Sequence, residues 1–205
     1  MGLIKKYMNQ TRKPEGTLGK MMLKGMNFGH AKLSDFGMSF LPKRDFFEIA
    51  ELGCGGGRNI DALLKKYKFA RVTGVDYSPL SVQKAKEYNI NNSTRCTVQQ
   101  GDVSKLDLPK EKYDLATAFE TVYFWPGLDV CFKNVYDILR KDGCFLIVNE
   151  LEGEDESSKK YEEMIDGLKV YKASEIEDAL LKAGFSEVEI NKAENNKWFA
   201  VVAKK

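Results

Sequence analysis

The residues best suited to chemistry are a glycine-rich run and two carboxylates that follow it along the chain. The run is Glu51-Leu-Gly-Cys-Gly-Gly-Gly57. Glycines let the backbone turn sharply and let a ligand approach where a Cβ would collide. Asp76 follows about 20 residues later, a spacing at which a carboxylate can accept hydrogen bonds from ribose hydroxyls. Asp102 ends a further apolar run. Together these residues predict a binding site for a ligand that carries a ribose.

Regular elements are needed to bring these residues together, and the pattern predicts them from about residue 45 onward. Short apolar runs predict seven strands at 46–52, 71–76, 96–100, 113–119, 144–149, 188–193 and 198–203. Amphipathic patterns between them predict helices at about 59–67, 79–88, 129–140 and 174–183. Ser78 is a suitable N-cap for the second of these helices because Pro79 stands at its first helical position.

The order of these elements indicates an α/β fold. Strands that alternate with helices form right-handed βαβ units and a parallel sheet covered on both faces. The last two strands are joined only by residues 194–197, too short a link for a crossover, so they should be antiparallel to each other. We therefore expect a three-layer Rossmann-like sandwich. Its seven-stranded sheet would be mostly parallel, with an antiparallel C-terminal hairpin and helices on both faces.

At the glycine-rich run and its carboxylates, the chain resembles the class I S-adenosylmethionine-dependent methyltransferases. The resemblance covers roughly residues 45–205, and ELGCGGG followed by VTGVDYSPLSVQKAKE is its most specific part. It implies that S-adenosylmethionine is bound and leaves as S-adenosylhomocysteine. The turn residues Gly53, Cys54, Gly55 and Gly57 would pack on its methionine and ribose portion. Glu51 would hold its amino group, directly or through water. The remaining cofactor-binding residues would be Asp76 at the ribose, Tyr77 beside the adenine, and Asp102 with Val103 at the adenine amino group.

A nicotinamide cofactor fits these residues less well. Its fingerprint, G-x-G-x-x-G, needs a third glycine for close packing of helix on strand. Arg58 occupies that position here. A dehydrogenase is therefore a distant alternative.

Three residues outside the glycine-rich run are candidates for catalysis. Glu120 and Tyr123 follow the fourth strand, where they should lie over the transferred methyl group and line an acceptor pocket. Glu120 could act as a general base, bind a cationic substrate or hydrogen-bond a loop. His30 is the only histidine, so its residue type allows acid–base chemistry, although a structural role is the more common one. Trp125 could equally line the pocket or pack against the next helix.

Composition restricts the partners. The 32 basic and 30 acidic residues leave a net charge of only +2, which does not favour nucleic acid as a partner. Cys54, Cys96, Cys131 and Cys144 form no CxxC pair, and with one histidine they predict no zinc site. Residues 152–156 resemble a solvated acidic loop more than a metal site. Neither a membrane-spanning run nor a signal peptide is evident, so a cytoplasmic location is expected.

Two regions lie outside the alternating pattern. Residues 1–44 should form an N-terminal helical cap or lid, with helical pieces interrupted by Pro14, Gly16, Gly25, Gly29 and Pro42. Residues 151–172 form an acidic insertion. The cap precedes the methyltransferase-like domain at 45–205, and we expect methyl transfer by direct displacement to a small-molecule acceptor. The alternatives are an RNA or protein methyltransferase and a non-catalytic cofactor-binding protein. Oligomeric state and the acceptor atom are not predicted.

Overall fold

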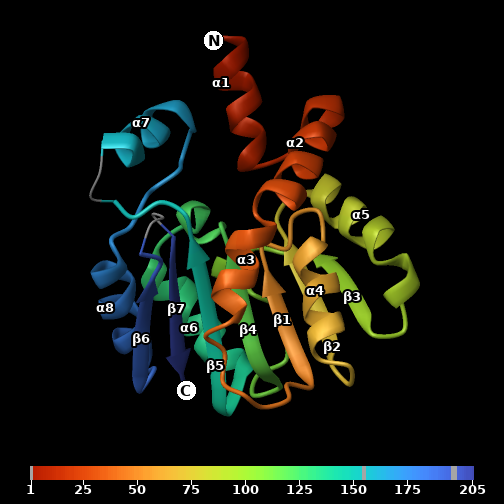
Figure 1. Cartoon of the computed structure of the whole chain (residues 1–205), viewed down its shortest axis with the longest axis vertical. Coiled ribbons are helices and arrows are strands. Elements are labelled where there is room, and N and C mark those ends of the chain that lie inside the picture. The colour runs from red at the N-terminus through yellow and green to blue at the C-terminus, as the bar shows by residue number, and fades with distance from the viewer. Residues whose placement is uncertain (1, 154–155, 195–197) are drawn as a thin grey trace.

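The computed structural model describes residues 2–153, 156–194 and 198–205, and these form a seven-stranded sheet with helices on both faces (Figure 1). The strands lie in the order β3-β2-β1-β4-β5-β7-β6. Their bounds are β1 Glu48–Leu52, β2 Arg71–Asp76, β3 Cys96–Gln100, β4 Tyr113–Phe119, β5 Leu139–Asn149, β6 Glu187–Lys192 and β7 Phe199–Lys204. Neighbouring strands among β1 to β5 are parallel, whereas β7 runs antiparallel to both β5 and β6. The mostly parallel sheet with an antiparallel C-terminal hairpin is therefore confirmed.

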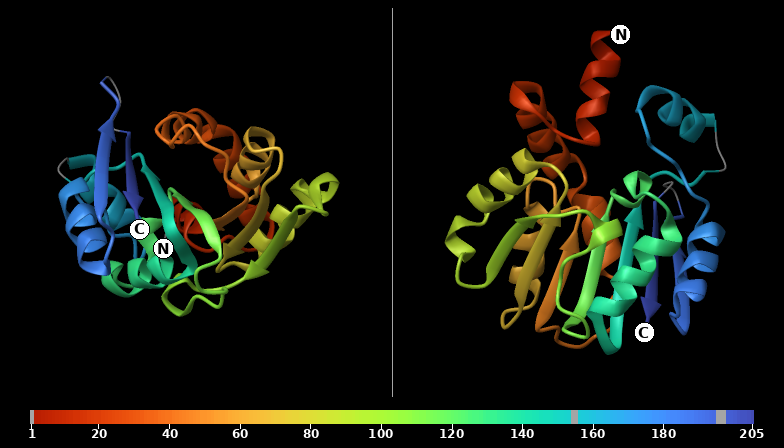
Figure 2. Two further views of the ribbon diagram at one scale, coloured as in Figure 1. Left: turned by 90° about the horizontal axis from the view of Figure 1, so that it is seen from below. Right: turned by 180° about the vertical axis from the view of Figure 1, so that it is seen from behind.

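The helices divide between the two faces and one end of the sheet. Their bounds are α1 Leu3–Met8, α2 Gly16–Gly29, α3 Ala31–Met38, α4 Arg58–Lys66, α5 Pro79–Tyr88, α6 Leu128–Ile138, α7 Glu156–Met164 and α8 Ala173–Ala183. Helices α3, α4 and α5 contribute to one buried core, and α6 and α8 to the other (Figure 2). Helices α1, α2 and α7 lie at the end where the parallel strands finish (Figure 1). No helix of the described residues is long and apolar enough to cross a membrane.

Side-chain alternation along each strand supplies both cores. In β1, Ala50 and Leu52 belong to the core beneath α6 and α8, whereas Ile49 belongs to the core beneath α3 and α4. This alternation follows from the two-residue period of a strand. A central strand with apolar residues on both faces is typical of a parallel sheet covered by helices on each side.

Two local predictions were wrong. Strand β5 begins at Leu139, five residues before the predicted start, because Leu139 is fully buried and pairs with Tyr113. The Asp142-Gly143 turn signal lies within this strand, where Asp142 has a positive φ of 61°. In the N-terminal region, Gly25 does not interrupt a helix, because α2 continues from Gly16 to Gly29.

Helix α2 and the insertion carry two further features of this end of the molecule. On α2, Met22 is buried, whereas Met21 is 59% exposed and Phe28 is 88% exposed, so these three side chains do not form one packed face. Within the insertion, residues 156–164 form α7, a helix that the sequence pattern did not predict. Residues of both α2 and α7 line one cavity at this end of the sheet.

Candidate active site

The glycine-rich run forms the turn between β1 and α4, and it is tied to the end of β2. The backbone N–H groups of Gly53 and Cys54 donate to the carbonyl of Val75 at 2.7 and 3.1 Å. Gly55 N–H donates to Asp76 Oδ2 at 2.8 Å. Gly57 has a φ of +83°, and a Cβ there would lie 2.7 Å from the Cα of Ala85. Glycine is therefore required at position 57 both by backbone conformation and by the close approach of α5.

Two carboxylates, Asp76 and Asp102, lie near this turn, and backbone N–H groups of other residues orient each of them. Asp76 Oδ1 accepts from Ser78 N–H at 2.9 Å while Oδ2 takes the Gly55 N–H. Asp102 Oδ1 accepts from the N–H and the hydroxyl of Ser104 at 2.8 and 2.7 Å. Burial raises the pKa of Asp76, and these backbone hydrogen bonds oppose the shift. Each carboxylate is thus held in place by hydrogen bonds, and both Asp76 and Asp102 line the cavity described next.

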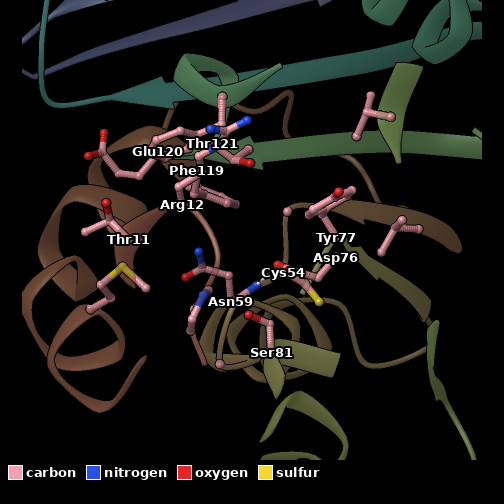
Figure 3. A pocket seen from close by; sticks show the side chains of 18 of the residues that line it. Thr11, Arg12, Cys54, Asn59, Asp76, Tyr77, Ser81, Phe119, Glu120 and Thr121 are labelled. Atoms are coloured by element: carbon pink, nitrogen blue, oxygen red, sulfur yellow. Dashed lines mark hydrogen bonds between the residues drawn. The ribbon is translucent and has the colours of Figure 1, made fainter. Parts of the chain in front are cut away.

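A cavity of about 340 Å³ opens at this turn, and we call it the turn cavity. Cys54, Asp76 and Tyr77 lie on one side of it, and Glu120 lies opposite (Figure 3). The predicted cofactor-binding residues that line it are Gly53, Cys54, Gly55, Asp76, Tyr77, Asp102 and Val103. A Cβ on Gly55 would meet no atom within 4 Å, so the backbone there borders open space.

Glu51 and Gly57 do not line the turn cavity. Glu51 is only 1% exposed and accepts a hydrogen bond from Thr117 on β4. Burial raises its pKa to about 8, against the opposing hydrogen bonds from Thr117 and Asn59. Asn59 lines the cavity and hydrogen-bonds Glu51, so it links the buried carboxyl to the cavity.

Beyond β4, Glu120 and Tyr123 lie together as the sequence predicted. Glu120 has a positive φ of 57°, a conformation that costs energy for a residue with a side chain. Its Oε1 accepts from the hydroxyl of Tyr123 at 3.1 Å and from the N–H of Glu150. Burial raises the pKa of Glu120 to about 8.

Tyr123 is 3% exposed, and its hydroxyl accepts from Leu151 N–H at 2.8 Å. The Tyr123 side chain therefore ties the end of β4 to the end of β5. Burial raises the pKa of Tyr123 well above its usual range, so the hydroxyl keeps its proton.

A second cavity of about 680 Å³ adjoins the first, and we call it the aromatic cavity. It lies between the N-terminal segment, the ends of β4 and β5, and α7. Its aromatic lining residues are Tyr7, Tyr123, Phe124, Tyr161 and Trp198. Both cavities are lined by Thr11, Met26, His30, Glu120 and Phe124, so they meet at these residues.

His30 reaches this junction from the N-terminal region, where it separates α2 from α3. One of its ring nitrogens lies within 4.8 Å of carboxylate oxygens from Glu120 and Glu150. Burial lowers the pKa of His30, and the charge of Glu150 opposes that shift. Two of the three catalytic candidates, His30 and Glu120, are therefore neighbours across the junction.

The N-terminal segment is fastened to the insertion by Asp166. Asn9 and Asp166 exchange two hydrogen bonds, and Lys5 pairs with the Asp166 carboxylate at 2.8 Å. Arg12, which lines the turn cavity, donates to the backbone carbonyl of Asp166 at 3.1 Å. The buried hydroxyl of Ser78 donates to the carbonyl of Pro14, which fixes the segment to the start of α5. Residues 9–14 thus connect the insertion to the glycine-rich turn.

Several lining residues were not predicted as site residues. Among them are Thr11, Pro14, Asn27, Ser34, Asn59, Ser81, Thr121 and Pro126. Asn59 and Ser81 lie on the first turns of α4 and α5, and their positions beside the strand ends were the one available signal. Trp125 lines the turn cavity but is also buried at 7% exposure and stacks on Phe145, so its packing role is established by the structure.

Known proteins share this sequence pattern and fold. A methyltransferase domain family matches residues 49–143, the stretch from β1 through the start of β5. The chain therefore carries a methyltransferase domain on the seven-stranded fold of the class I S-adenosylmethionine-dependent methyltransferases. A sterol 24-C-methyltransferase of Eremothecium gossypii is 24% identical over 160 residues, which are 72% of this chain and 43% of that protein.

Other relatives are as distant. A trans-aconitate 2-methyltransferase of Enterobacter is 29% identical over 103 residues, covering 50% of this methyltransferase and 39% of the relative. The chain thus spans less than half the length of these curated relatives.

Solved structures share the fold at low sequence identity. The protein solved in complex with the Trm112 methyltransferase activator of Haloferax volcanii superimposes with a TM-score of 0.81 at 18% identity, covering 100% of this chain and 98% of that one. Human N-acetylserotonin methyltransferase, solved with S-adenosylmethionine, gives 0.74 at 19% identity, covering 90% and 55%.

Proposed function

We propose that this methyltransferase transfers a methyl group from S-adenosylmethionine in the turn cavity to a small molecule in the aromatic cavity. One observation carries the proposal: the two cavities share His30, Glu120 and Phe124. A ligand in each cavity would therefore meet the other at this junction. Aligned reactants at contact distance can supply much of the rate of such a displacement.

The turn cavity fits the cofactor. Asp76, already held by two backbone N–H groups, would accept hydrogen bonds from the ribose hydroxyls. Tyr77 is 56% exposed and would lie beside the adenine, with Asp102 and Val103 at its amino group. Open space next to Gly55 would receive the part of the cofactor that a Cβ would displace. Because Glu51 is buried, we propose that it acts on the amino group through Asn59 or a water.

The chemistry needs few groups from the protein. When bound, S-adenosylmethionine supplies a methyl carbon made electrophilic by the adjacent sulfonium. Glu120 and His30 face the junction, where they could orient the acceptor and receive its proton if the accepting atom carries one. Tyr123 would position Glu120 through its hydroxyl. We therefore assign Tyr123 a positioning role and not a catalytic one.

Residues 1–44 would act as a lid over the acceptor. Tyr7, Met8 and Met26 come from this region and line the aromatic cavity. The hydrogen bonds of Asp166 hold the segment against the insertion. Opening of this segment would admit the acceptor, and its closure would exclude water from the junction.

A small-molecule acceptor is supported by the apolar and aromatic lining of the second cavity. The names of curated relatives point the same way, since sterols, trans-aconitate and fatty acids are small molecules. The net charge of +2 does not favour nucleic acid. RNA and protein acceptors, and a cofactor-binding protein without activity, remain the alternatives for experiment.

The test is methyl transfer from labelled S-adenosylmethionine to panels of small alcohols, carboxylic acids, amines and sterols, with RNA and protein in parallel. We expect transfer to a small molecule, reduced at least tenfold in kcat by Glu120→Gln and unchanged by the surface variant Glu163→Gln. Transfer to RNA or protein alone would contradict the proposal. Tight binding of S-adenosylhomocysteine without turnover on any acceptor would favour the non-catalytic alternative.

A further inference from the structure

Three potential metal ligands converge at the junction of the two cavities. His30, Glu120 and Glu150 each offer one ligand atom, and these atoms all lie within 4.8 Å of one another. The residues come from three separate parts of the chain: the link between α2 and α3, the residue after β4 and the residue after β5. The fold, and not local sequence, therefore brings them together.

The carboxylates of Glu120 and Glu150 lie close to each other in this cluster. Among the described residues, neither Glu120 nor Glu150 has a lysine or arginine nitrogen within 4.0 Å. Two carboxylates this close repel each other, and the repulsion is stronger where water is partly excluded. A bound cation would remove that repulsion.

Glu120 is held in one orientation, as metal ligands commonly are. Its Oε1 takes hydrogen bonds from Tyr123 and from the Glu150 backbone. Its backbone adopts a φ of 57°. Outer hydrogen bonds of this kind fix a ligating carboxylate and leave its other oxygen to face the ion.

We propose that His30, Glu120 and Glu150 bind one divalent transition-metal ion of the Mn²⁺ or Zn²⁺ class. One imidazole nitrogen and two carboxylate oxygens suit such ions, whereas an all-oxygen set would favour Mg²⁺ or Ca²⁺. The sequence did not predict this site, because no local spacing relates His30, Glu120 and Glu150.

The geometry requires a small adjustment. With metal–ligand distances of about 2.1 Å, ligand atoms in a tetrahedral site lie about 3.4 Å apart. The three atoms lie within 4.8 Å of one another, so each pair must draw together by at most about 1.4 Å. Glu150 is exposed at the surface and can rotate to do so.

The open coordination positions would face the aromatic cavity, which His30, Glu120 and Glu150 all line. An oxygen atom of the acceptor, from a hydroxyl or a carboxylate, would complete the coordination. This part of the inference rests on the proposed function, whereas binding of the ion does not. An ammonium group is the competing occupant, since two carboxylates could hold one without a metal.

The test uses the full chain and Mn²⁺ alone, followed by electron paramagnetic resonance, in which bound and free Mn²⁺ differ. We expect one Mn²⁺ per chain, displaced by Zn²⁺. His30→Ala and Glu150→Gln should each weaken Mn²⁺ binding at least tenfold, and Glu163→Gln should leave it unchanged. S-Adenosylhomocysteine titrations of each variant show whether the fold and the turn cavity are intact.

Two results would overturn the metal site. The first is that protein which still binds S-adenosylhomocysteine binds neither Mn²⁺ nor Zn²⁺ at millimolar concentration. The three residues would then serve acid–base chemistry or bind an ammonium group. The other is metal binding that survives both His30→Ala and Glu150→Gln. Failure of the proposed function would instead appear as loss of S-adenosylhomocysteine binding or turnover, with Mn²⁺ binding retained.

Discussion

The buried carboxyl of Glu51 should make the stability of this methyltransferase depend on pH. Burial raises its pKa to about 8 in the folded chain, against an ordinary value of 4.5. The folded state therefore holds a proton that the unfolded state releases. The contribution of Glu51 to the free energy of unfolding is fully present below about pH 4.5 and is lost as the pH rises through about 8. Since one pKa unit corresponds to about 1.4 kcal/mol, raising the pH from 6 to 9 should cost about 2–3 kcal/mol.

The assay is urea unfolding at pH 6 and pH 9, on the wild type and on Glu51→Gln. Glutamine resembles the protonated carboxyl, so the variant should lose about 2–3 kcal/mol less than the wild type over this range. Comparing the two chains removes the contribution of Glu120, whose pKa burial also raises to about 8. Glu163→Gln is the surface control and should follow the wild type. Equal pH dependence in the wild type and Glu51→Gln would refute the reasoning.

Three further predictions concern the turn and the N-terminal segment. Gly57→Ala should destabilise the chain by more than about 2 kcal/mol, because it combines strain at positive φ with overpacking on α5. Gly55→Ala has open space around the new Cβ, so urea unfolding should show a loss of only about 1–2 kcal/mol. Gly55→Ala should weaken the binding of S-adenosylhomocysteine more than Gly57→Ala does. Equal stability losses in the two variants would contradict this. Ser78→Ala should cost about 1–2 kcal/mol, because its buried hydroxyl caps α5 and binds the Pro14 carbonyl; a thermal melt unchanged from the wild type would exclude that role. Asp166→Ala should raise the acceptor KM with little change in S-adenosylhomocysteine affinity, because the hydrogen bonds of Asp166 hold the N-terminal segment against the insertion. A similar loss of cofactor affinity, or no change in the acceptor KM, would count against the lid.

Much of the sheet followed from local patterns. Strands β2, β3 and β4 have the predicted bounds, because each is a short apolar run closed by polar or glycine residues. Ser78 caps α5 as expected, with its hydroxyl accepting from Ser81 N–H. The start of β5 was missed because Leu139 can continue an apolar helix face as well as begin a strand. Only its pairing with Tyr113 decides between the two.

The site was predictable where strand ends determine it and not where distant segments meet. The glycine-rich turn, Asp76 and Asp102 were identified because parallel strands place their carboxyl ends at one edge. The neighbourhood of His30, Glu120 and Glu150 was not, because nothing local relates residues so far apart in the sequence. The burial of the Glu51 side chain was not predicted either, because its hydrogen-bond partner, Thr117, lies on a neighbouring strand far away in the sequence.

The central claim, that S-adenosylmethionine binds at the glycine-rich turn beside Asp76, is tested most directly by calorimetric titration with S-adenosylhomocysteine. The wild type and Asp76→Ala are compared, with NAD as the control ligand. We expect tight binding by the wild type, at least about tenfold weaker binding by Asp76→Ala, a loss of about 1.4 kcal/mol, and none of NAD. A folded wild type that binds NAD, or that fails to bind S-adenosylhomocysteine, would contradict the claim.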